Sequence, residues 1–146
     1  MRTMPWAKRA ALGFVAAAIA TFTFHQAMWA ALYAVSLMPL APFPMGPTAP
    51  FGVPRIISLA FWGGLYGAAF GLALPRLSGP LWRAGLGLGL IAALVGLFIV
   101  TAIKGQPVAY GFAFRPWLLS LLINGFWGLG VGLIMQLMMP RSTRVA

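Results

Sequence analysis

Four long apolar stretches, separated by short segments that contain proline, glycine and basic residues, dominate the hydropathy pattern of the chain. They cover residues 11–38, 56–74, 84–103 and 117–139. A helix needs about 20 residues to cross a hydrocarbon core of about 30 Å, and each stretch comes close to that length or exceeds it. The pattern therefore predicts an all-α membrane protein, a four-transmembrane-helix bundle that makes up a single domain over residues 1–146.

Six prolines lie at the boundaries of these stretches: Pro39, Pro54, Pro75, Pro80, Pro116 and Pro140. Proline is tolerated where a helix begins or ends, whereas inside a helix it removes a hydrogen bond and causes a kink. No proline falls inside a stretch, so the sequence predicts no kink. The first stretch resembles a signal peptide, but its apolar run continues to Leu40 without a small-residue cleavage site, so we expect it to be retained as a span.

The composition supports this assignment, since 62% of the residues are hydrophobic, 7% are charged and none is Asp or Glu. A soluble domain needs far more charged surface. The ten Lys and Arg residues stand singly or in small groups at the ends of the apolar stretches. We therefore expect the lipid bilayer, and not a nucleic acid, to be their partner.

The basic residues also predict how the chain crosses the membrane. One side collects seven of them: Arg2, Lys8, Arg9, Arg76, Arg83, Arg141 and Arg144. The other side has three: Arg55, Lys104 and Arg115. Because cytoplasmic segments are enriched in Lys and Arg, both termini are predicted to be cytoplasmic, in a multi-pass protein of a bacterial inner membrane.

The connections between the spans differ in kind. Spans two and three are joined by a short turn, which predicts that they are antiparallel neighbours. The external loop 39–54 carries six prolines, which favour a stiff polyproline-like segment. Its apolar side chains Phe43, Met45 and Phe51 indicate that it packs on the membrane face. The second external loop, 105–115, alternates aromatic residues, which fits a short hairpin or an interfacial segment.

Glycine residues recur four positions apart inside the last three spans: Gly63, Gly67 and Gly71, Gly85 and Gly89, and Gly128 and Gly132. Small residues at this spacing form a groove in which two helix backbones approach closely, held by dispersion and weak Cα–H···O contacts. The alternative interpretation is that glycine is simply common in membrane helices. The spacing predicts helix–helix contacts, either within one chain or between copies of it.

Spans two and four resemble each other. Both 61–63 and 126–128 read Phe-Trp-Gly, and each is followed at the same distance by Pro-Arg. Both spans run from outside to inside, so a duplication would be a 2+2 hairpin repeat of the parallel kind. The alternative is a shared boundary rule, proline then arginine, together with a biased composition.

Polar side chains in hydrocarbon are costly, which makes them candidates for function. Four lie at suitable depths in spans one, two and four: His25, Gln26, Tyr66 and Asn124. His25, Tyr66 and Asn124 would meet if these spans share a core, and Gln26 lies beside His25 in the sequence. One interpretation is a proton-sensitive or ligand-contacting site, since imidazole titrates near neutral pH. The other is structural, with a neutral histidine hydrogen-bonded to Gln, Tyr or Asn across helices.

The remaining chemistry is sparse. The external cations Arg55, Lys104 and Arg115 either create a positive vestibule or snorkel at the interface in the ordinary way. The chain has no cysteine and no acidic pair, and it lacks a phosphate loop and the spacing of zinc ligands. We therefore expect no catalytic residue, no metal site and no cofactor, and we do not expect an enzyme.

Three segments carry a resemblance: Thr-Phe-His-Gln at 23–26, Pro-Phe-Gly-Val-Pro-Arg at 50–55 and Asn-Gly-Phe-Trp-Gly at 124–128. They are similar to segments of small four-span inner-membrane proteins of proteobacteria, and the resemblance covers most of the chain. It implies a four-span inner-membrane protein and brings no activity to carry over. The membrane glutamate on which small multidrug exporters depend and the motifs of fluoride channels are not found.

Three functional hypotheses follow. The leading one is a non-catalytic accessory subunit of a larger membrane complex, or a self-associating scaffold, based on the glycine spacing and the lack of catalytic groups. The alternative is a small oligomeric channel or carrier for an anion or a neutral solute, based on the polar cluster and the positive external loops. The third is a redox subunit that contacts heme or quinone through His25.

Overall fold

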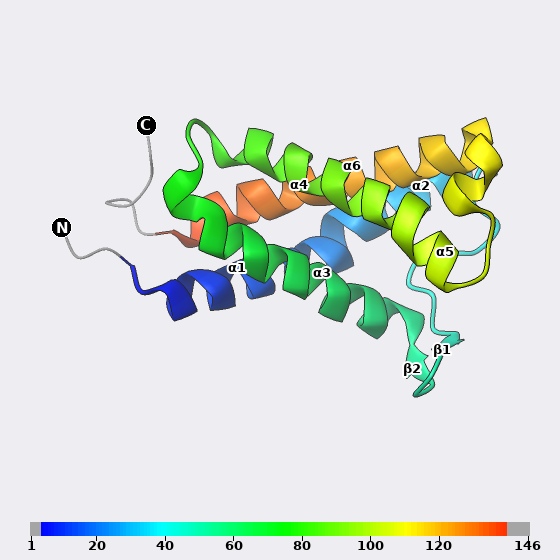
Figure 1. The fold of residues 1–146 in the computed structure, drawn as a ribbon, viewed down its shortest axis with the longest axis horizontal. Helices are drawn as coiled ribbons and strands as arrows, with labels where there is room; N and C mark the ends of the chain where they lie inside the picture. Colours follow the sequence, from blue (N-terminus) through cyan, green and yellow to red (C-terminus); the bar gives the residue numbers. More distant parts are fainter. Residues whose placement is uncertain (1–3, 140–146) are drawn as a thin grey trace.

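The structure, a computed structural model, describes residues 4–139. Its α-helices are α1 (Trp6–Ala20), α2 (Gln26–Ala34), α3 (Arg55–Ala73), α4 (Leu81–Val95), α5 (Thr101–Ile103) and α6 (Phe114–Met138). Shorter elements join or extend them: the π-helical turns η1 (Thr21–His25) and η3 (Gly96–Val100), the 3₁₀ turns η2 (Leu74–Arg76) and η4 (Val108–Phe112), and the strands β1 (Pro47–Thr48) and β2 (Val53–Pro54). Figure 1 shows the helices lying side by side.

Four continuous helical segments result, because the π-helical turns connect α1 to α2 and α4 to α5 without a break. They are Trp6–Ala34, Arg55–Arg76, Leu81–Ile103 and Phe114–Met138, each long and apolar enough to cross a membrane. These segments confirm the four predicted spans. The first begins earlier than expected, at Trp6, directly after Pro5, whose φ of −55° suits the start of a helix.

Two of the spans are not α-helical throughout. η1 interrupts the first span and η3 the third, each with five residues of π-helix and no proline. A π-helical turn adds a residue to the turn by i→i+5 hydrogen bonding, and it occurs frequently at functional sites. Both turns lie beside the pocket described below.

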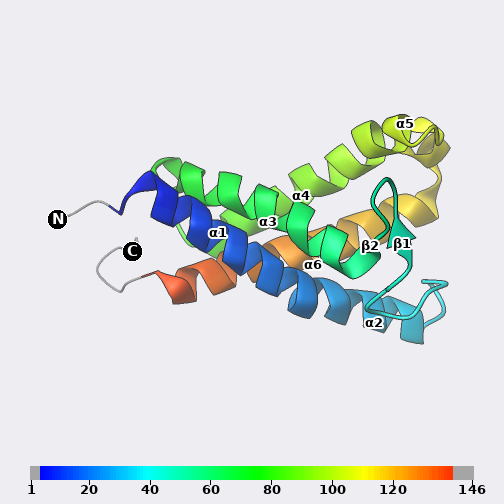
Figure 2. The same ribbon diagram turned by 90° about the horizontal axis from the view of Figure 1, so that it is seen from below.

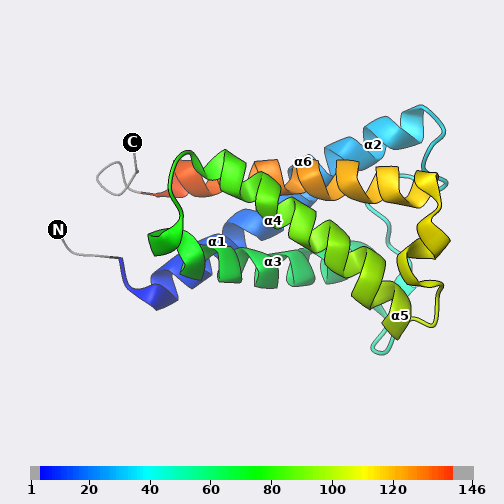
Figure 3. The same cartoon turned by 45° about the horizontal axis from the view of Figure 1, so that its top comes forward.

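The spans pack as two close pairs. α1 packs along α3, α4 packs along α6, and contacts between α1 and α6 join the two pairs. α3 and α4 are consecutive and antiparallel, as predicted, but they contact each other far less than either contacts its own partner. Figure 3 shows the first span passing from α3 to α6, with α1 beside the former and α2 beside the latter. In Figure 2, α1 begins and α6 ends at the same end of the bundle.

Glycines let the backbones of each pair touch. In the first pair, a Cβ atom on Gly67 would clash with the carbonyl oxygen of Gly13, and one on Gly71 would clash with that of Arg9. Gly13 faces the carbonyl oxygen of Gly67 in return. Contacts of this kind rest on dispersion and Cα–H···O attraction, because lipid supplies no hydrophobic drive for helices to associate.

The second pair has the same kind of contact. A Cβ atom on Gly85 would clash with the carbonyl oxygen of Gly128, and the reverse also holds. Gly89 lies against the carbonyl oxygen of Asn124, and Gly132 against that of Leu81. All these contacts lie within one chain. Six of the seven predicted glycines therefore pack helices of the same chain against each other, one of the two arrangements that the spacing allowed.

The external loop 39–54 is tied to the end of the first span. Trp29 Nε1 donates to the carbonyl oxygen of Leu40 at 2.8 Å. β1 and β2 pair as a minimal antiparallel ladder, with Thr48 opposite Val53, in place of a continuous polyproline segment. Phe51, at the tip between the strands, is 87% exposed, so it makes little contact with the rest of the described chain.

The second external loop forms η4, and no hairpin, within the described residues; inside η4, Ala109, Tyr110 and Gly111 have left-handed backbone with φ of 54°, 51° and 62°. Its Phe112 stacks on Trp117 with ring centroids 5.9 Å apart, and Phe98 meets Trp117 edge-on at 5.8 Å. Trp117 Nε1 donates to the carbonyl oxygen of Ala109 at 3.0 Å. This cluster closes the end of the α4–α6 pair.

A candidate polar pocket between the helix pairs

A pocket of about 150 Å³ lies where the two helix pairs meet, and residues of all four spans line it. Its polar lining residues are Thr21, His25, Tyr66 and Asn124. His25, Tyr66 and Asn124 therefore border one space, as their depths along the spans suggested. Gln26, the fourth predicted site residue, does not line the pocket and acts on it through His25.

Gln26 determines which nitrogen of His25 carries the proton. Its side-chain Oε1 accepts a hydrogen bond from the backbone N–H of Phe43 at 2.6 Å, so its amide nitrogen Nε2 faces the opposite way. That Nε2 lies 3.1 Å from Nδ1 of His25. An amide nitrogen can only donate, so Nδ1 accepts, and the neutral imidazole keeps its proton on Nε2.

Nε2 of His25 carries a proton that no residue of the described chain accepts. His25 is 8% exposed, and Nε2 has no hydrogen-bond partner among residues 4–139. Within that range, Nε of Arg9 is the one fully buried side-chain nitrogen or oxygen that lacks a partner. Nε2 is therefore not sealed off, and the space that His25 borders is the pocket. The imidazole also lies against Trp29, with ring centroids 5.9 Å apart, which limits its rotation.

A hydrogen-bonded indole forms the floor of the pocket. Trp127 Nε1 donates to the carbonyl oxygen of Ala17 at 3.2 Å and to Oγ1 of Thr21 at 3.1 Å. Thr21 in turn donates to the carbonyl oxygen of Ala17 at 3.0 Å. Thr21 is 1% exposed and Trp127 3%, so this network holds α6 to the first span at the deepest part of the pocket.

Tyr66 and Asn124 each have side-chain polar atoms that make no hydrogen bond within the described chain. The ring of Tyr66 meets Trp127 edge-on with ring centroids 6.3 Å apart, and its hydroxyl has no hydrogen-bond partner in the described chain. Asn124 Nδ2 donates to the carbonyl oxygen of Ser120 at 2.9 Å, which leaves Oδ1 and the second amide hydrogen available. Both side chains are half-buried.

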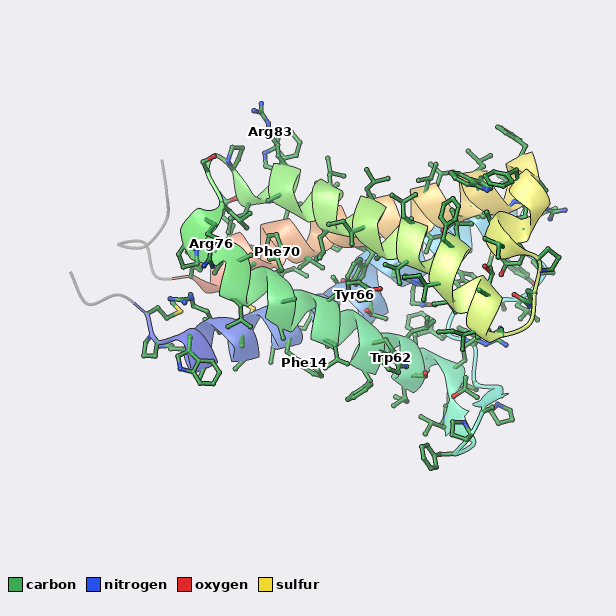
Figure 4. All side chains as sticks on the ribbon, viewed as in Figure 1. Phe14, Trp62, Tyr66, Phe70, Arg76 and Arg83 are labelled. Atoms are coloured by element: carbon green, nitrogen blue, oxygen red, sulfur yellow. The ribbon has the colours of Figure 1, made fainter. Side chains whose placement is uncertain are left out.

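The pocket opens on the face formed by α3 and α4. Trp62 and Val100 line it and are exposed, whereas Thr21 and Trp127 on its other side are buried. Figure 4 shows Tyr66 in the interval between α3 and α4, with Trp62 farther along α3. Since α3 and α4 scarcely touch, the mouth faces sideways from the bundle and not along its axis.

Small residues on both sides of this mouth shape the pocket. Gly63 lines it from α3, and a Cβ atom there would lie 2.8 Å from Oγ1 of Thr21, so the nearest neighbours of this predicted packing glycine are side chains. Gly96 lines it from η3, and a Cβ atom there would meet nothing within 4 Å. A side chain at 96 would therefore project into free space.

The predicted external cations do not take part in the pocket. Arg115 donates to the carbonyl oxygen of Leu37 at 2.6 Å and so ties α6 to the end of the first span. Neither Arg55 nor Lys104 lines the pocket, and no hydrogen bond within the described chain joins the three. The pocket thus holds no charged lining residue.

Sequence reasoning did not assign Trp62, Gly96 or Trp127 to the site. A signal existed for the two tryptophans, because they occupy equivalent positions in the two Phe-Trp-Gly tripeptides. Gly96 carried none, since it stands outside the regular glycine spacing. The assembled chemistry is one N–H donor at His25, the hydroxyls of Thr21 and Tyr66, the amide of Asn124 and two indole surfaces.

No protein-family model matches the chain, and neither a curated protein nor a solved structure is significantly similar to it.

Proposed function

We propose that this chain is a non-catalytic, multi-pass inner-membrane protein that binds a small uncharged molecule in the pocket between its two helix pairs. One observation carries the proposal: all four spans contribute to a pocket in which two polar lining groups, Nε2 of His25 and the hydroxyl of Tyr66, have no hydrogen-bond partner within the described chain. An unpaired polar atom inside a membrane protein costs free energy, which a ligand in the pocket would recover.

The uncharged nature of the ligand follows from the lining. A carrier for an anion would need a cation at its site, and Arg55, Lys104 and Arg115 do not line the pocket. Without a charged partner, an ion would have to leave water uncompensated. The lining of the pocket therefore favours a neutral solute over an anion.

The glycine contacts no longer argue for a self-associating scaffold. Six of the seven predicted glycines are occupied by backbone contacts inside one chain, as with Gly67 against Gly13 and Gly85 against Gly128. These faces are not available to a second copy. Association with other copies or with the subunits of a larger complex stays a prediction with no surface assigned to it.

The proposed orientation puts both termini in the cytoplasm. It is supported by Lys8, Arg9, Arg76 and Arg83, which belong to the end of the bundle where α1 begins, and Figure 4 labels the last two. Arg2, Arg141 and Arg144 lie outside the described residues. Since the chain has no cysteine, Ser78→Cys and Gln106→Cys give single labelling sites at opposite ends. A membrane-impermeant maleimide should label Cys at 106, and not at 78, in intact cells; the reverse would overturn the orientation.

A duplication of a helical hairpin is also proposed, with α1–α3 and α4–α6 as its copies. Two pairs of equivalent residues support it. Trp62 and Trp127 both line the pocket, and Gly67 and Gly132 both meet the backbone of the first helix in their own pair. Under this proposal the pocket lies at the junction of the two copies, where transporters with repeats commonly bind.

The binding function is tested with a substitution that places a large side chain in the pocket. Gly96→Leu should project into the pocket, whereas Gly87→Leu, on the same span, projects into open space away from it. Each protein is purified gently from its own membrane, and small molecules bound to it are identified by mass spectrometry. A stoichiometric neutral molecule retained by Gly87→Leu and lost from Gly96→Leu is expected. Equal retention by both variants, or no such molecule on the native protein, would refute the function.

A further inference from the structure

We infer that the pocket takes the head group of an oxidised quinone, a flat uncharged ring with two carbonyl oxygens, whose apolar tail leaves between α3 and α4. The inference rests on the proposed binding function and specifies the ligand of that site. It concerns binding alone, and no electron or proton transfer is part of it. The tautomer of His25, the lining of the pocket and the direction of its mouth each support it.

The first support is the hydrogen-bond donor that the fold prepares. The backbone of Phe43 orients Gln26, and Gln26 occupies Nδ1 of His25, so the imidazole presents N–H at Nε2. This group can donate and cannot accept. The ligand therefore has an acceptor oxygen, which a quinone carbonyl supplies.

The second support is a further donor on a different span. Tyr66, on α3, lines the same pocket, and its hydroxyl has no hydrogen-bond partner in the described chain. It can donate to the second carbonyl of the ring. Asn124, from α6, keeps one amide hydrogen free beyond its bond to Ser120. An uncharged ligand with two acceptor oxygens can accept hydrogen bonds from these donors, and each of its own polar atoms then has a partner.

The third support is the shape and chemistry of the walls. Trp127 is held in place by hydrogen bonds to Ala17 and Thr21, so it offers a fixed indole surface, and Trp62 offers a second one nearer the mouth. Gly96 and Ala92 leave the α4 side almost flat. A volume of about 150 Å³ is enough for one six-membered ring. Aromatic surfaces favour a flat ring in stacked or edge-on contact.

The fourth support is the sideways mouth. The exposed residues Trp62 and Val100 stand at the pocket edge on the face of two apolar spans, and α3 and α4 are not sealed together. A ligand enters there from the lipid without crossing the polar ends of the bundle. A quinone fits this route, because its head enters the pocket while its tail stays in hydrocarbon.

The test measures binding of a decyl-substituted benzoquinone to the protein in lipid nanodiscs, through quenching of tryptophan fluorescence. We expect saturable quenching that Gly96→Leu weakens about tenfold or more and that Gly87→Leu leaves within about twofold. Decanol, which has the same tail and no carbonyl ring, should not compete. Saturable binding that Gly96→Leu does not weaken, or competition by decanol at equal concentration, would overturn the quinone assignment.

A second variant probes the donors without disturbing the fold. Tyr66→Phe removes a hydroxyl that bonds to nothing in the described chain, and it should weaken the quinone about three- to tenfold. Tyr33→Phe, at an exposed position outside the pocket, is the control and should change nothing. Unchanged affinity in Tyr66→Phe would remove the second donor and with it the two-carbonyl argument.

The two proposals fail separately. If a resident neutral molecule depends on Gly96 but the benzoquinone does not bind, the pocket functions and the quinone assignment is wrong. If the benzoquinone binds to the native protein and to Gly96→Leu alike, it binds elsewhere, and the inference is wrong whatever molecule is resident. If neither molecule binds, both proposals are refuted.

Discussion

Gln26 donates from its side-chain amide to Nδ1 of His25, its neighbour in sequence, across 3.1 Å. The same amide accepts from the backbone of Phe43 in the external loop, so the loop, the glutamine and the histidine form one chain of hydrogen bonds. Its consequence is a histidine whose free nitrogen is a donor. A rotation of the amide by 180° would lose the bond from the N–H of Phe43 whichever nitrogen of His25 carried the proton, and therefore the loop fold specifies the tautomer deep in the span.

His25 should show the Nε2–H tautomer directly. It is the sole histidine in the sequence, so labelling with ¹⁵N-histidine gives the ring signals of one residue. We expect a proton attached to Nε2 and none attached to Nδ1 in solid-state or detergent NMR spectra. The opposite tautomer would show that the amide of Gln26 is reversed and would remove the donor from the pocket.

Gln26→Leu should destabilise the fold. Gln26 is 2% exposed, and its removal leaves the N–H of Phe43 and Nδ1 of His25 without their partner. A buried group left unpaired costs about 1–3 kcal/mol. The measurement is the free energy of unfolding in mixed micelles titrated with SDS. Gln106→Leu, in an exposed loop, is the matched control and should lie within about 0.5 kcal/mol of the native protein.

Gly67→Ala should destabilise the monomer without changing its association state. The new methyl group would clash with the carbonyl oxygen of Gly13, and backbone cannot give way as a flexible side chain can. Overpacking of this kind costs about 1–3 kcal/mol. Gly87→Ala, in open space on α4, is the control and should be neutral or slightly stabilising. Loss of a dimer, with the stability of the monomer unchanged, would show that Gly67 packs between chains instead.

The spans could be predicted from sequence because their physics is local. A run of apolar residues long enough to cross the bilayer is visible without any tertiary contact, and all four runs are helical in the structure. The boundaries were less accurate. α6 begins at Phe114 and includes Pro116 in its first turn, where the missing N–H has no intrahelical partner to lose.

The candidate site was only partly predictable, for a different reason. The depth of His25, Tyr66 and Asn124 along the spans follows from counting residues. That the three side chains lie at a similar depth in the bundle could therefore be predicted. The direction of Gln26 was not, since it depends on where the loop brings Phe43. The π-helical turns also have no local signature here, because the residues of η1 and η3 would fit an ordinary α-helix equally well.

The contact between Trp127 and Thr21 offers the last test, because it joins the two helix pairs at the pocket floor. Trp127→Phe removes the donor Nε1, and Thr21→Val removes the acceptor Oγ1, while each keeps most of the volume. In a double-mutant cycle the two changes should couple by about 0.6–1.7 kcal/mol, the range for hydrogen bonds between membrane helices. Trp127→Phe combined with Thr23→Val is the control, since Thr23 is exposed and donates to Ile19 of its own helix, and this pair should be additive. Additivity of Trp127→Phe with Thr21→Val would show that the carbonyl of Ala17 alone anchors the indole. Equal coupling with both threonines would show that the two pairs are held together without this bond.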